Sequence, residues 1–125
     1  MKYVVSIGSN ECQRENMPLA RRRLTELFAD IRFSHEEETI PIRLHRSCMF
    51  ANQVACFHSD LRPEEVRARL KDIEREAGRS PEDKLREIVK LDIDLLMCGD
   101  CVLKPEDWER EYVQEGLNYL KMHSL

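Results

Sequence analysis

Residues 90–100, Lys-Leu-Asp-Ile-Asp-Leu-Leu-Met-Cys-Gly-Asp, constrain the fold of this chain more than any other stretch. Their apolar side chains alternate with polar ones, which predicts a strand with one buried face. That face comprises Leu91, Ile93, Leu95 and Met97. Asp92 and Asp94 then lie together on the opposite face, although aspartate is a poor strand former.

The two aspartates of this strand need a compensating partner. A rise of about 3.3 Å per residue separates their carboxylates by roughly 6–7 Å. With an effective dielectric constant near 20, two unit charges at that distance repel by about 2–3 kcal/mol. Water, a lysine or arginine, or a divalent cation between them would offset this repulsion. The residues alone leave both a solvated strand face and a metal site open.

Composition narrows the class of protein. The chain has 125 residues and a formal net charge of −4, which argues against a dedicated nucleic-acid binder. It contains no apolar run of the roughly 20 residues that a membrane helix needs. Five cysteines and no export signal indicate reduced thiols in a cytoplasmic protein. We expect one domain over residues 1–125, a monomer with a dimer as the alternative, and no nucleic-acid or membrane partner.

The remaining elements can be placed from their patterns. Strands are predicted at 2–7, 31–40 and 48–58, with a turn at 8–10 and a loop at 41–47. Helices are predicted from about Asn16, from Pro63 to a C′ glycine at Gly78, and from Pro105 to Leu120. A polar loop covers 79–89. The order β-α-β-β-α-β-α predicts an α+β, ferredoxin-like antiparallel sheet with helices on one face, plus a C-terminal helix.

Two further features carry chemistry only in context. Asn52 shares a strand face with Phe50 and Val54, where it is either a hydrogen-bonded core residue or a ligand-binding one. Cys98-Gly99-Asp100-Cys101 has CxxC spacing, but a structural zinc site needs a second ligand pair. Ordinary packing is therefore the favoured interpretation of these two cysteines.

Taken together, five motifs resemble the 6-hydroxymethyl-7,8-dihydropterin pyrophosphokinase family of folate synthesis. They are Ser-Ile-Gly-Ser-Asn at 6–10, Thr-x-Pro at 39–41, Phe-x-Asn-x-Val at 50–54, Ile-Glu-x-x-x-Gly-Arg at 73–79, and Leu-Asp-Ile-Asp-Leu-Leu-x-x-Gly at 91–99. The resemblance covers residues 3 to about 103 and includes the ferredoxin-like fold. No single motif is decisive, but their shared order and spacing are specific.

The resemblance implies an activity and a set of site residues. The family transfers the terminal pyrophosphoryl group of ATP to the hydroxymethyl oxygen of a reduced pterin and releases AMP. It implies two Mg²⁺ ions between the triphosphate and Asp92 and Asp94, with Arg79 as a further catalytic residue. The ATP-binding residues would be Lys71, Glu74 and Arg79. The pterin-binding residues would be Thr39, Pro41, Ile42, Phe50 and Asn52.

The chain also departs from the family pattern. Arg86 stands where the family loop carries a tryptophan, and Val89 stands where it carries an arginine, for which Arg86 or Lys90 is a candidate substitute. The family's Pro-His and Arg-x-Phe segments are not recognised after Lys104. The alternatives are a catalytically degenerate nucleotide- or protein-binding module, and pyrophosphoryl transfer to another heterocyclic alcohol.

Overall fold

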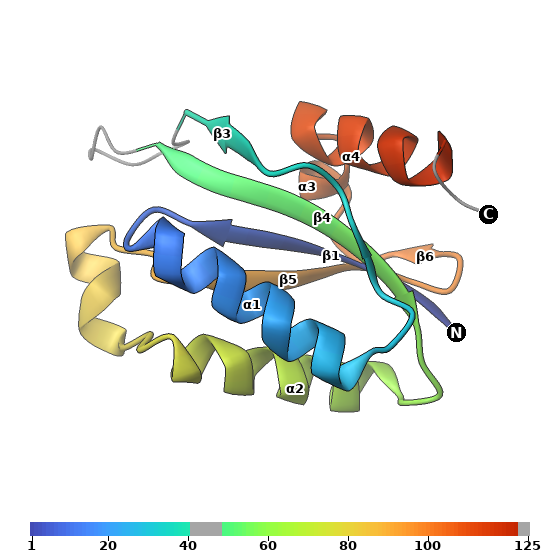
Figure 1. The fold of residues 1–125 in the computed structure, drawn as a ribbon, viewed down its shortest axis with the longest axis horizontal. Helices are drawn as coiled ribbons and strands as arrows, with labels where there is room; N and C mark the ends of the chain where they lie inside the picture. The colour runs from blue at the N-terminus through green and yellow to red at the C-terminus, as the bar shows by residue number, and fades with distance from the viewer. Residues whose placement is uncertain (41–48, 123–125) are drawn as a thin grey trace.

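The computed structural model describes residues 1–40 and 49–122 (Figure 1). Its elements are β1 (Lys2–Ser9), α1 (Gln13–Leu27), β2 (Arg32–Phe33), β3 (Glu37–Thr39), β4 (Phe50–His58), α2 (Pro63–Glu76), the 3₁₀ helix η1 (Pro81–Arg86), β5 (Asp92–Cys98), β6 (Cys101–Val102), α3 (Pro105–Trp108) and α4 (Glu111–Met122). The predicted α+β class with an antiparallel sheet is confirmed. The predicted loop at 41–47 and the first residue of the predicted strand 48–58 lie outside the described residues.

The sheet is built around β1. Its strands run in the order β2-β4-β1-β5-β6, and β3 also pairs with β4. β1 pairs antiparallel with β4 and with β5, so its backbone is hydrogen-bonded on both sides. Tyr3, Val4, Val5 and Ile7 are each fully buried, which is what a central strand covered on both faces requires.

Helices cover both faces of this sheet (Figure 1). α1 and α2 pack on one face, where Leu24 and Leu70 join the side chains of Tyr3, Val5 and Ile7 in one core. α4 packs on the other face in a second, smaller core, whose buried members are Val4, Val54, Cys56, Leu96, Tyr112, Val113 and Leu120. The predicted C-terminal helix therefore closes the face that α1 and α2 leave open. None of the helices in the described part of the chain is long and apolar enough to cross a membrane.

A β-bulge interrupts the alternation of β5. Val4 pairs with Met97, but Val5 pairs with Leu95, so Leu96 is the extra residue. Ile93 and Leu95 lie in the α1/α2 core as predicted. The prediction that Met97 shares their face is wrong, because the bulge turns Met97 toward the α4 core.

Three predicted elements differ in detail. The predicted strand 31–40 is two short strands, and between them Ser34 bonds to Val54 through its backbone N–H, 2.8 Å, and its hydroxyl, 2.9 Å. The predicted helix from Pro105 to Leu120 breaks after Trp108 into α3 and α4. α1 begins at Gln13, three residues before the predicted Asn16, after Cys12 in a left-handed conformation with φ 52°.

Candidate functional site

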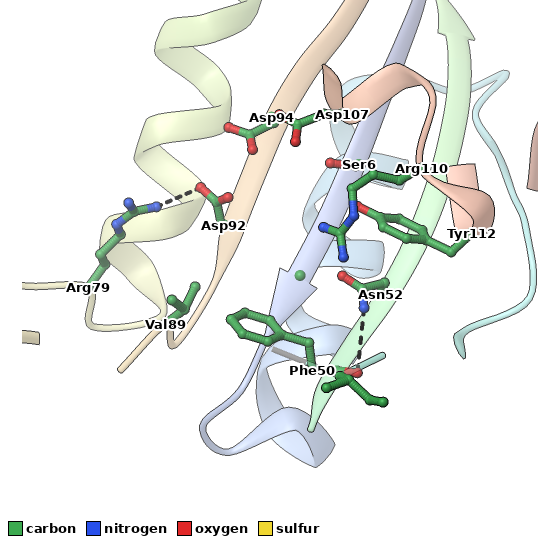
Figure 2. A pocket seen from close by; sticks show the side chains of 12 residues that line it. Ser6, Phe50, Asn52, Arg79, Val89, Asp92, Asp94, Asp107, Arg110 and Tyr112 are labelled. Atoms are coloured by element: carbon green, nitrogen blue, oxygen red, sulfur yellow. Dashed lines mark hydrogen bonds and ion pairs between the residues drawn. The ribbon is translucent and has the colours of Figure 1, made fainter. Parts of the chain in front are cut away.

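One cavity opens over the ends of the three central strands, on the face that α4 covers. Its volume is about 280 Å³. The strand register explains its floor, because Ser6 pairs with Asp94, and Gly8 pairs with both Asp92 and Asn52. Figure 2 shows the lining residues: Ser6, Gly8, Ile40, Phe50, Asn52, Arg79, Val89, Asp92, Asp94, Asp107, Arg110 and Tyr112.

Gly8 keeps the middle of this floor open. A Cβ added there would lie 3.3 Å from Asn52 Oδ1 and 3.9 Å from Phe50 Cδ1. Any side chain at this position would thus occupy the space between Asn52 and Phe50. The glycine of the Ser-Ile-Gly-Ser-Asn motif therefore lies at the point of the cavity floor where a side chain would fill the cavity.

Asn52 is both a hydrogen-bonded buried residue and a cavity-lining residue, the two possibilities that the sequence left open. Its side chain is 4% exposed. Its Nδ2 donates a hydrogen bond to Thr39 Oγ1, across the β3–β4 pair, so Thr39 orients the amide. Asn52 and the half-buried Phe50 nevertheless both face the cavity (Figure 2). Pro41 and Ile42, the other predicted pterin-binding residues, lie outside the described residues.

The two aspartates of β5 are each paired with a cation. Arg79 Nη1 donates to Asp92 Oδ1 at 2.9 Å. Lys104 Nζ donates to Asp94 Oδ1 at 3.0 Å. Burial raises the pKa of Asp94, and the neighbouring Asp92 raises it further, whereas Lys104 acts in the opposite direction. Burial lowers the pKa of Lys104, but the adjoining Asp94 carboxylate outweighs burial and raises it overall.

A second cavity meets the first at these carboxylates. It has a volume of about 210 Å³ and lies between α2, β5 and Lys104. Both cavities are lined by Arg79, Asp92 and Asp94. The second is otherwise lined by Arg67, Leu70, Lys71, Glu74, Ile93, Leu95 and Lys104. All three predicted ATP-binding residues, Lys71, Glu74 and Arg79, are therefore brought together on its wall.

Glu74 also has a structural task. Its side chain is 10% exposed, and Oε2 accepts a hydrogen bond of 2.8 Å from the Ile93 backbone N–H. Arg79 Nη1 lies 3.2 Å from the same Oε2 atom. Glu74 thereby ties α2 to β5 and orients Arg79 toward Asp92.

The loop that precedes β5 is held close to the first cavity by Asn10. Asn10 Oδ1 accepts a hydrogen bond of 2.7 Å from the Val89 N–H, and Asn10 Nδ2 donates one of 2.9 Å to Glu87 O. Val89 lines the first cavity. The two candidate substitutes for an arginine there do not line either described cavity: Arg86 is exposed, and Lys90 Nζ donates to Gly78 O at 2.8 Å.

Sequence reasoning did not identify Asp107 and Arg110 in the wall that the C-terminal helices supply. Asp107, Arg110 and Tyr112 line the first cavity opposite Phe50 (Figure 2). The Arg110 guanidinium lies 4.8 Å from the centre of the Tyr112 ring. Burial raises the pKa of the Tyr112 phenol, against a hydrogen bond from Ser6 that lowers it. The available signal was the spacing of Arg110-Glu111-Tyr112, which is that of an Arg-x-Phe segment with tyrosine in place of phenylalanine.

The aspartate pair fits a metal that arrives with a phosphate ligand. Among residues 1–40 and 49–122, no three His, Cys, Asp or Glu side chains are grouped to hold a metal ion. Mg²⁺ in phosphoryl-transfer sites is usually bound through one or two carboxylates, with phosphates and water completing its octahedron. Asp92 and Asp94 match that requirement.

Comparison with known proteins agrees with this geometry. A family model described as 7,8-dihydro-6-hydroxymethylpterin-pyrophosphokinase matches residues 4–122. The match extends from β1 through α4, about twenty residues beyond the last motif that the sequence resemblance used. A search of curated proteins finds no match.

Proposed function

Because the chain belongs to the 7,8-dihydro-6-hydroxymethylpterin-pyrophosphokinase family of folate biosynthesis, we propose that it transfers the pyrophosphoryl group of ATP to the hydroxymethyl oxygen of a reduced pterin and releases AMP. The observation that carries this proposal is the meeting of two cavities at Arg79, Asp92 and Asp94. A transfer between two substrates needs both of them to reach one set of charged groups. The protein would act as a monomeric, cytoplasmic, single-domain enzyme.

The first cavity is suited to the pterin. The Asn52 amide, oriented by Thr39, would hydrogen-bond the polar edge of the ring. Phe50 would pack against the ring, with Gly8 leaving the floor open beneath it. Pro41 and Ile42, which follow Ile40 in the chain, are the other residues that the family resemblance assigns to pterin binding. The hydroxymethyl group would then point toward Asp92 and Asp94.

The second cavity is suited to the nucleotide. It is lined by four cationic side chains, Arg67, Lys71, Arg79 and Lys104, which favour phosphate oxygens. Asp92 and Asp94 would hold two Mg²⁺ ions together with the triphosphate, and these ions would neutralise the charge that develops on the phosphate oxygens. Arg79 would orient the transferred group while Glu74 fixes the position of its guanidinium.

One observation favours a second candidate function. Val89 places an aliphatic side chain in the first cavity at the position where the family carries an arginine. Arg86 and Lys90 do not line either described cavity to replace it. A chain with fewer phosphate-binding cations could bind a nucleotide without transferring its pyrophosphoryl group, and would then be a nucleotide-binding module.

Calorimetry followed by a turnover assay separates these functions. The chain is titrated with a non-hydrolysable ATP analogue and Mg²⁺, then with a hydroxymethyl pterin, and AMP release is measured with ATP. Asp92→Asn should abolish AMP release, whereas Asp60→Asn, an exposed carboxylate outside both cavities, should not. Binding of both ligands without AMP release would support the module, and binding of neither would end both proposals.

A further inference from the structure

Lys104 occupies an unusual place for a cation beside a metal-binding carboxylate. It lies at the residue before α3, and its side chain reaches back to Asp94 on β5. The Lys104 side chain is 45% exposed and the Asp94 side chain 28% exposed. Both residues line the second cavity, so a ligand there can contact the partly exposed ammonium group.

The charges at this point can be balanced in two ways. In the structure, Asp92 is paired with Arg79, which it shares with Glu74, and Asp94 is paired with Lys104. A divalent cation bound to the same carboxylates supplies the same charge. It would also repel cationic groups that remain about 3 Å from those oxygens, with an energy that grows as the site loses water. A metal and these side chains thus compete for one pair of carboxylates.

Arg79 and Lys104 differ in what holds them once the carboxylates are taken. Arg79 Nη1 also lies 3.2 Å from Glu74 Oε2 and 3.3 Å from Leu91 O, so it keeps its place. The hydrogen bond described for Lys104 Nζ is to Asp94. Its ammonium group is carried by a flexible four-carbon stem, which allows a change of partner that a planar guanidinium in a fixed network does not.

We propose that Lys104 exchanges partners when the substrates load: it neutralises Asp94 in the free protein and passes to a phosphate oxygen of the nucleotide when a divalent cation takes Asp94. This inference rests on the proposed function, because the anion that receives Lys104 is the triphosphate. Each ligand then favours the other. Lys104 would be free to bind the phosphates once a metal held Asp94, and its contact with the phosphates would in turn favour metal binding at Asp94.

The sign of two binding constants tests this exchange. Lys104→Met keeps a stem of similar length and removes the charge. It should bind Mn²⁺ alone about fivefold more tightly than the natural chain, and the ATP analogue with Mg²⁺ at least about fivefold more weakly. Free Mn²⁺ is measured by electron paramagnetic resonance, and the analogue by calorimetry. A residue that only supports the fold would change both affinities in the same direction.

Two matched variants control the experiment. Lys71→Met removes a cation from the same cavity that has no described bond to Asp92 or Asp94, so it should weaken the analogue and leave Mn²⁺ binding unchanged. Lys104→Arg keeps the charge, so in both titrations it should lie closer to the natural chain than Lys104→Met does. Thermal melting of each variant shows that the comparison is made between folded proteins.

Each result decides the question. Mn²⁺ binding by Lys104→Met that is unchanged, weaker or undetectable would overturn the exchange while the proposed function stands. Tighter Mn²⁺ binding with an unchanged analogue affinity would make Lys104 a counter-ion only and would also overturn it. A natural chain that binds no analogue would refute the proposed function, and the exchange with it.

Discussion

Gly116 sets how closely α4 approaches the sheet, and its replacement by alanine gives the sharpest stability prediction. A Cβ at Gly116 would lie 3.0 Å from Val54 Cγ2, 3.1 Å from Val54 Cβ and 3.2 Å from Ser34 Cβ. All three distances are shorter than an ordinary carbon–carbon contact of about 3.5–4.0 Å. The contacted atoms belong to Val54 on β4 and to Ser34, which is hydrogen-bonded to Val54 twice, so we expect the helix to move instead.

Two opposing terms set the magnitude of the Gly116→Ala effect. Alanine is favoured over glycine inside a helix by about 1 kcal/mol. Forcing an extra methyl group into a packed interface costs about 1–3 kcal/mol. We therefore expect a net loss of about 0–2 kcal/mol. Tyr112 lies one helical turn earlier in α4, so the same displacement should withdraw its ring from the first cavity and weaken pterin binding.

Urea denaturation of Gly116→Ala beside Asn118→Ala measures the balance. Asn118 is exposed on the same helix, so its replacement gains helix propensity without a new contact and should stabilise the protein by up to about 0.7 kcal/mol. If Gly116→Ala also stabilised the protein, by about 1 kcal/mol, then the close approach of α4 to Val54 and Ser34 would be refuted. An unchanged affinity for the pterin would refute the link between helix position and cavity wall.

Three further variants test the site. The raised pKa of Asp94, caused by burial and Asp92, means that its stabilising contribution is present at low pH and is lost as the pH rises through the folded-state pKa. Asp94→Asn should therefore be more stable than the natural chain at pH 7 in metal-free buffer. The difference in stability should disappear as the pH falls toward 3.8, the ordinary pKa of aspartate. Equal urea midpoints of the two proteins at pH 7 would contradict this prediction. Asn10→Ala leaves the Val89 N–H without its acceptor, so it should lower the free energy of unfolding by about 1–2 kcal/mol and speed hydrogen exchange at Val89. Unchanged exchange at Val89 would show that other contacts hold the loop. Gly8→Ala places a methyl group 3.3 Å from Asn52 Oδ1. It should abolish pterin binding in calorimetry while the free energy of unfolding changes by less than about 1 kcal/mol. Retained affinity would mean that the pterin does not lie on the floor of the first cavity.

Local patterns were sufficient to predict the parts of the site that lie on single strands. The alternation around Asp92 and Asp94 predicted that both face away from the main core, and the structure confirms that placement because side-chain alternation depends only on the strand itself. Asn52 was likewise identified as an unusual residue on a strand face. Its contact with Thr39 follows from the pairing of β3 with β4.

Features that depend on distant contacts could not be predicted. The bulge at Leu96 arises in the pairing of β5 with β1, and no residue type within β5 indicates it. The position of Arg110 and Tyr112 in the cavity depends on the break after Trp108 and on the docking of α4 through Gly116. The partner of Asp94 is ten residues away along the chain and beyond a hairpin, so spacing alone did not connect it with Lys104.

The extra residue at Leu96 divides β5 into two halves with opposite parity. Before it, odd-numbered side chains enter the α1/α2 core, and after it the even-numbered Cys98 does so. Losing Leu96 alone would remove the bulge but leave Met97 opposite Val4 and Cys98 opposite Tyr3, so the end of the strand would keep its place in both layers. A one-residue change of length at the bulge need not turn Asp92 or Asp94, because both precede it in the strand. The place of these carboxylates over the cavity depends instead on the pairing of Asp92 with Gly8 and of Asp94 with Ser6.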